Sequence, residues 1–181
     1  MDDDRLVERA RRGDSRAFAA LASKHRRSLY CTAYSILGSS WDASDAVQEA
    51  LLEGWARVDA LRDPAHFKPW LARILVNTCF DALGRRSRVI LSGDAPPEDP
   101  RRADAHTFVG SETQLDLFRA IRGLEKDQRM VVALRFFNDL KIDDIAAMLD
   151  VPAGTVKSRI NRALARLAQD LGRPAPLEVG S

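Results

Sequence analysis

The chain has 181 residues, enough for one domain or two small ones, and its formal net charge of +2 means that any nucleic-acid surface must be local. No stretch approaches the ~18 apolar residues that a membrane-spanning helix needs, and the acidic start Asp2-Asp3-Asp4 is the reverse of a secretory signal. We therefore expect a cytoplasmic protein with no membrane insertion. Cys31 and Cys79 lack CxxC spacing or clustered histidines, so we expect two buried thiols and no metal or redox site.

The pattern of apolar residues predicts an all-α protein. Val89-Ile90-Leu91 is the only conspicuous strand candidate, and it is short. A first helix is expected near 4–11, and Gly13-Asp14 then breaks the chain and can cap a long helix that ends near Gly38. His25 on that helix has no spaced partner ligand, so a packed or half-exposed histidine is the expectation.

The next predicted helix, about 42–60, is acidic on one side. Its outward face carries Asp45, Gln48, Glu49 and Leu52, and no base interrupts its acids. Such a face is either a protein-docking surface or a solvated face with favourable charge near the start of a helix. Composition alone favours the solvated face.

A further long helix is predicted from about 67 to 88. Its exposed stripe, at steps of four and three, is formed by Arg73, Asn77, Asp81, Arg85 and Arg88. Phe67 and Trp70 could hold an unstacked base or fill the core, and we expect Trp70 in the core because it lies close to the apolar arc. Gly84 could end or loosen this helix.

Composition changes between Ser92 and Gly110, where three prolines stand among charges with few apolar residues. This is typical of a flexible linker. The predicted organisation is therefore a helical domain at 1–91, a linker at 92–111, a second helical domain at 112–173 and a tail at 174–181.

The second domain is expected to end in a helix-turn-helix. After two helices that start near 112 and 125, apolar residues recur at helical spacing from Ile142 to Leu149, and a second amphipathic helix follows the Asp150–Gly154 turn. Opposite its apolar arc lies a polar and basic strip that includes Lys157, Ser158, Arg159, Asn161, Arg162 and Arg166. Cations attract phosphates, and Asn, Ser and Arg pair with base edges in the major groove. An ordinary hairpin with a solvated basic face fits this pattern about equally well.

The stretch from Pro152 to Ala163 adds a resemblance. Pro152-Ala153-Gly154-Thr155-Val156-Lys157-Ser158-Arg159, followed by Arg162-Ala163, resembles the promoter-reading helix of bacterial sigma factors of the extracytoplasmic-function (ECF) class. Leu124–Arg129 resembles that family's L-P-x-x-x-R, with Glu125 in place of proline. The resemblance implies contacts to the minus-35 element by Arg135, Thr155, Lys157, Ser158, Arg159, Asn161 and Arg162.

Two stretches of the first domain resemble the same family. Asp45–Leu52 followed by Trp55 is similar to its D-x-V-Q-E-x-F-L-x-x-W run, which implies contacts of Asp45, Gln48, Glu49 and Leu52 with core RNA polymerase. The run from Phe67 to Asp81 resembles the promoter-opening segment. It implies minus-10 contacts through Asn77 and Asp81, with Arg85 and Arg86 attracting the DNA backbone.

The resemblance implies a transcription initiation factor that binds core RNA polymerase and promoter DNA and is restrained by an anti-sigma factor. No catalytic residues, metal or cofactor are expected, because no nucleophile arrangement, ligand cluster or phosphate-cradling loop occurs. Two other hypotheses stay open at this stage. One is a stand-alone regulator that dimerises on a symmetric operator, and the other is a sigma-like decoy that sequesters other factors.

Overall fold

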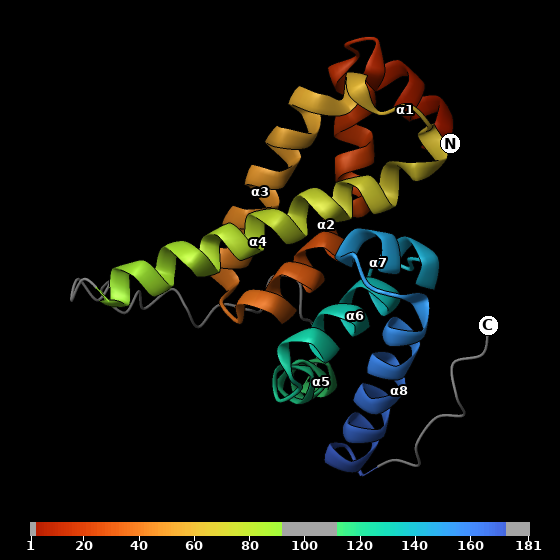
Figure 1. Ribbon diagram of the computed structural model, residues 1–181. Helices are drawn as coiled ribbons and strands as arrows, with labels where there is room; N and C mark the ends of the chain where they lie inside the picture. The colour runs from red at the N-terminus through yellow and green to blue at the C-terminus, as the bar shows by residue number, and fades with distance from the viewer. Residues whose placement is uncertain (1–2, 92–111, 173–181) are drawn as a thin grey trace.

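The structure is a computed structural model that describes residues 3–91 and 112–172, and over these ranges it is helical without strands (Figure 1). The predicted linker and tail lie outside the described residues. The first segment contains α1 (Asp3–Arg11), α2 (Ser15–Leu37), α3 (Ser40–Arg57) and α4 (Phe67–Leu91), with short 3₁₀ turns at Val58–Ala60 and Pro64–His66. The second contains α5 (Glu112–Arg122), α6 (Lys126–Phe136), α7 (Ile142–Leu149) and α8 (Ala153–Asp170).

Local capping sets the bounds of α2. The Asp14 carboxylate accepts hydrogen bonds from the backbone N–H groups of Arg16 and Ala17, which would otherwise lack partners at the start of the helix. At the other end Gly38 adopts φ 73°, a left-handed conformation, and its N–H donates to the Tyr34 carbonyl. The predicted break at Gly13-Asp14 and the predicted end near Gly38 are confirmed.

The core of the first domain lies where α2, α3 and α4 pack together, with α1 across α2 (Figure 1). Phe67 and Cys79 are buried there, and Trp70 is half-buried against Phe67, with ring centroids 5.9 Å apart. His25 is also buried, which confirms its expected packed position. Phe67 is therefore a core residue and does not form a pocket for a base.

The structure settles two points at the end of α4 that the sequence left open. The helix continues past Gly84 to Leu91, three residues beyond the predicted end, and the strand candidate Val89-Ile90-Leu91 forms its last turn, in agreement with the predicted all-α fold. Glycine costs only about 1 kcal/mol in a helix relative to alanine and keeps its N–H, so a long helix can continue through it. A three-residue apolar run carries no period that separates helix from strand.

The second domain is held by the crossing of α6 and α8. Val131 and Leu134 on α6 and Val156 and Ile160 on α8 are fully buried, as their spacing predicts. Ile121 and Leu124 form a smaller cluster with three residues of α6 and α8: Val132, Ala163 and Leu167. These contacts fix the direction of α8 relative to the rest of the domain.

The two domains are packed against each other. Helix α6 lies along α2, α5 also contacts α2, and α7 lies against α4 (Figure 1). Met130, Val131 and Leu134 of α6 belong to the same buried apolar cluster as residues of α2. We call this contact, between α2 and α4 on one side and α5, α6, the 137–140 turn and α7 on the other, the interdomain seam.

Gly38 offers a test of backbone strain near this seam. A Cβ added at Gly38 would lie 2.8–2.9 Å from the Arg122 guanidinium, whereas one at Gly13, also with positive φ, would meet nothing within 4 Å. We expect Gly13→Ala to lower the free energy of unfolding by about 1 kcal/mol through strain alone, and Gly38→Ala by about 2 kcal/mol. Urea unfolding of both variants measures the difference, and equal losses would contradict the contribution of Arg122.

Candidate nucleic-acid interface

A tight left-handed turn sets the angle between α7 and α8. Asp150 has φ 53° and its N–H donates to the Ala146 carbonyl, which ends α7, and Pro152 immediately precedes α8. The side chain of Lys141, the residue before α7, makes no capping hydrogen bond. The buried residues of α8 recur at helical spacing, so its opposite face is left to solvent. The helix-turn-helix expected from the sequence is present.

The outward face of α8 carries the predicted base-reading residues. Ser158 and Arg162 are exposed, and Thr155, Lys157 and Asn161 are half-buried. The Ser158 hydroxyl donates to the Thr155 carbonyl, and Arg162 Nε donates to the Ser158 carbonyl at 3.2 Å. These bonds along the helix hold the polar side chains on one surface, as major-groove reading requires.

Arg159 differs from its neighbours because it faces the scaffold of its own domain. Its guanidinium lies 2.5 Å from the Asp127 carboxylate on α6, and its side chain is 22% exposed. The polar and basic strip predicted for α8 does not reveal this partner. Asp127 is distant in sequence, and its position depends on how α6 and α8 cross. Arg159 therefore links two helices, a role that competes with base reading.

We expect Arg159→Ala to act mainly on stability. Loss of a partly exposed ion pair and its packing should lower the free energy of unfolding by up to about 1 kcal/mol. Promoter affinity should change less than threefold. Urea unfolding and DNA titration separate these effects, and a loss of DNA affinity as large as that of Arg162→Ala would show that Arg159 reads DNA.

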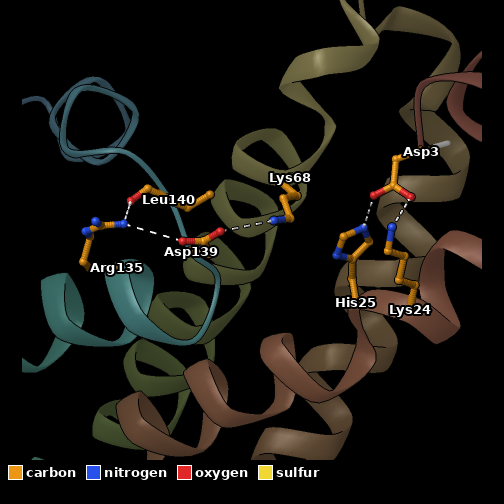
Figure 2. A network of polar contacts seen from close by, with 7 residues as sticks. All are labelled: Asp3, Lys24, His25, Lys68, Arg135, Asp139 and Leu140. Atoms are coloured by element: carbon orange, nitrogen blue, oxygen red, sulfur yellow. Dashed lines mark hydrogen bonds and ion pairs between the residues drawn. The ribbon is translucent and has the colours of Figure 1, made fainter.

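Arg135 lies at the seam beside the turn that follows α6. Its guanidinium donates to the Leu140 carbonyl at 3.2 Å and lies 3.7 Å from the Asp139 carboxylate, which in turn is 4.0 Å from the Lys68 amine on α4 (Figure 2). Asp139 adopts φ 51°, an uncommon conformation that carries its exposed carboxylate between the two cations. Arg135 therefore lies next to the Lys68–Asp139 ion pair, which joins the two domains.

A second cluster in Figure 2 contains the buried His25. Asp3 accepts a hydrogen bond from Lys24 at 2.6 Å, and its other oxygen is 3.3 Å from His25 Nε2. Burial lowers the pKa of His25, while the Asp3 carboxylate acts in the opposite direction. This cluster ties α1 to α2 and lies within the first domain.

The predicted stripe on α4 is exposed at Arg73, Asn77, Asp81 and Arg85. Arg85 lies 3.6 Å from the Glu49 carboxylate of α3, so the polar face of α4 adjoins the acidic face of α3. The side chain of Arg86 lies outside the part of the chain whose side chains are described. These groups could hold a DNA strand through amide, carboxylate and guanidinium contacts.

The four predicted docking residues lie together on the outer face of α3. Asp45, Gln48, Glu49 and Leu52 are all exposed, Leu52 at 64%. Beside them an open apolar hollow of about 480 Å³ lies between α2 and α3, lined mainly by Phe18, Val47, Leu51, Leu52 and Trp55. The sequence reading missed this hollow, although Leu52 and Trp55, three residues apart on the outward side of the helix, were a signal for it. An acidic face beside an apolar hollow fits a protein partner.

Within the described residues, no group of three His, Cys, Asp or Glu could hold a metal ion. None of the helices described is long and apolar enough to cross a membrane.

Comparisons with known proteins agree with this arrangement. The family model for Sigma-70 region 2 matches residues 21–89, and the model for Sigma-70, region 4 matches residues 114–167. The ECF RNA polymerase sigma-E factor of Escherichia coli K12 is 32% identical over 174 residues, which cover 90% of this chain and 91% of that protein. The RNA polymerase sigma-H factor of Pseudomonas aeruginosa is 31% identical over 172 residues, or 89% of each chain.

Solved structures with the same fold include two complexes. CnrH in complex with the cytosolic domain of CnrY is similar with a TM-score of 0.66 and 26% identity, covering 94% of this chain and 97% of that one. The sigma factor RpoE of Bartonella quintana, in complex with the anti-sigma factor NepR, has a TM-score of 0.68 and 28% identity, covering 80% and 89%.

Two sigma-70 regions in this order define a transcription initiation factor, not an enzyme. The chain belongs to the ECF family of sigma factors, as the resemblance of its motifs indicates.

Proposed function

We propose that this sigma factor divides promoter recognition between its two domains. Residues 1–91 dock on core polymerase through Asp45, Gln48, Glu49 and Leu52 and engage the opened minus-10 element through Asn77, Asp81, Arg85 and Arg86. Residues 112–173 read the minus-35 element as duplex through Thr155, Lys157, Ser158, Asn161 and Arg162, with Arg135 nearby. Residues 92–111 connect the two, and 174–181 form a tail.

The observation that carries this proposal is that three polar faces lie on three different helices. The acidic face of α3 suits a protein partner, the polar face of α4 adjoins it through the Arg85–Glu49 pair, and the basic face of α8 belongs to the other domain. One chain can therefore hold polymerase through α3 and the minus-35 duplex through α8 at the same time. A cytoplasmic location, where polymerase acts, is part of the proposal.

Footprinting tests whether each domain binds its own promoter element. With core polymerase and the DNA upstream of its own gene, the protein should protect two separate patches, one at the minus-35 element and one at the minus-10 element, because each domain covers one element. Protection of a single symmetric operator without polymerase would favour the stand-alone regulator. Binding to core with no DNA protection on any promoter fragment would favour the decoy.

We also infer that an anti-sigma factor restrains this protein. The support comes from the similar structures, in which RpoE is bound by an anti-sigma factor and CnrH is bound by CnrY. The apolar hollow beside Leu52 is a suitable contact for such a partner, since an exposed apolar surface of this kind commonly marks a protein interface. A co-purifying protein that abolishes transcription in proportion to its binding would support the inference, and one that binds without inhibiting would not.

A further inference from the structure

Helix α3 begins with a tryptophan that is not among the docking residues named above. Trp41 is 53% exposed, although burial of so large an apolar side chain is favourable. Within the described residues, four large apolar side chains are exposed, and three of them lie on α3: Trp41, Leu52 and Trp55. Exposed apolar side chains gathered in this way are typical of a surface that a partner covers.

Helical spacing places Trp41 in line with the proposed docking residues. Positions 41, 45, 48 and 52 are separated by four, three and four residues, so their side chains follow one stripe along the helix. At ~1.5 Å per residue, the stripe from Trp41 to Leu52 is ~16 Å long, whereas the part from Asp45 to Leu52 is only ~10 Å long. Trp41 therefore extends the docking face by about one turn toward the start of α3.

The backbone around Trp41 is held in place by the start of the helix. The Ser39 hydroxyl accepts a hydrogen bond from the backbone N–H of Asp42, which caps α3. Ser39 and Ser40, which precede Trp41, are buried, and Ala43 is completely buried in the core of the first domain. Because this turn is fixed before any partner binds, covering the indole ring costs little conformational entropy.

The charges beside Trp41 favour a protein partner over DNA. A small polar hollow of about 160 Å³ lies between α3 and α4. The charged groups that line it are three carboxylates and one guanidinium: Asp42, Asp45, Glu49 and Arg85. This excess of carboxylates repels phosphates and attracts cationic side chains. A partner that fits here presents an apolar group to Trp41 and a lysine or arginine to the hollow.

We propose, on the basis of the docking function assigned to α3 above, that Trp41 is a further docking residue for core RNA polymerase. Core polymerase is the partner because the stripe that contains Trp41 is continuous with the face proposed to bind it. The carboxylates select a cationic partner surface, and Trp41 adds apolar contact area at the end of the face opposite Leu52 and Trp55. Tryptophan is enriched among the few residues that supply most of the affinity of protein interfaces.

The test is the affinity of labelled Trp41 variants for core polymerase, measured by fluorescence anisotropy. Trp41→Ala should weaken binding at least about tenfold, whereas Trp41→Phe, which keeps an aromatic ring, should weaken it less than about threefold. His66→Ala is the matched control, because it removes a 63% exposed ring from the connection between α3 and α4. Its affinity for core should stay within about twofold of wild type. Urea midpoints of all three variants should match wild type, since neither ring is buried.

Photocrosslinking identifies what covers position 41. Trp41→p-benzoylphenylalanine, irradiated in the complex of core polymerase, this protein and promoter DNA, should form an adduct with a polymerase subunit. Adducts with DNA alone, or the absence of any adduct with polymerase, would overturn the role of Trp41, and so would wild-type core affinity in Trp41→Ala.

A failure of Trp41 is distinguishable from a failure of the proposed function. If alanine at Asp45, Gln48 and Glu49 weakens core binding while Trp41→Ala does not, the docking face stands and Trp41 lies outside it. If both variants bind core like wild type, the docking face itself is wrong.

Discussion

Replacement of Asp45, Gln48 and Glu49 by alanine should lower the affinity for core RNA polymerase about 100-fold, which corresponds to about 3 kcal/mol. The three side chains are exposed on one face of α3, and loss of interface charges and hydrogen bonds typically costs about 1 kcal/mol or more for each group. The fold should survive, because none of them is buried. Titration of labelled protein with core polymerase, followed by fluorescence anisotropy, measures the change.

The matched control for this variant also removes one aspartate and one glutamate, but from the second domain. Asp116 and Glu125 are exposed in the second domain, so Asp116→Ala, Glu125→Ala changes net charge equally without touching α3. Core affinity should stay within about twofold of wild type in this control. If the α3 variant also binds core like wild type, the assignment of the docking face is wrong.

Arg162→Ala, combined with Lys157→Ala, should reduce affinity for minus-35 duplex about 100-fold while binding to core polymerase is retained. Arg162 is exposed on the reading face, and a lost base contact costs about 1–3 kcal/mol. A lost phosphate contact adds to this and also flattens the salt dependence. Anisotropy titrations of a labelled promoter duplex at several salt concentrations measure both changes.

Arg166→Ala is the control for the reading face. Arg166 is an exposed arginine of the same helix, one turn after Arg162, and it pairs with Asp170. Its removal lowers the charge of α8 without removing a predicted base contact, so affinity should fall less than fivefold. If Arg166→Ala lost as much affinity for the duplex as the Lys157→Ala, Arg162→Ala variant, α8 would contribute only general electrostatic attraction.

Much of the local structure could be predicted from the sequence. Capping chemistry marked the ends of α2, because Asp14 supplies a side-chain acceptor and Gly38 tolerates positive φ. The buried residues of α8 followed their helical period. The predicted site residues of α3 lie on one exposed face for the same reason. Their roles in binding remain predictions.

The seam was not predicted, because it depends on contacts between residues far apart in the chain. One signal was available in the sequence: the five consecutive residues from Met130 to Leu134 are all apolar, and the structure buries all of them. A helix that is apolar around its whole circumference has to be covered on every side, and its own domain covers only part of it. The pairing of Arg159 with Asp127 could not be predicted either, because helical periodicity does not identify the partner of a long side chain.

The most direct test of the central claim is run-off transcription by core polymerase on DNA from upstream of this protein's own gene, with and without the protein. ECF membership and the two reading domains predict a discrete transcript that requires the protein and disappears in the α3 variant. Absence of any protein-dependent transcript, together with failure to co-elute with core polymerase, would contradict the account.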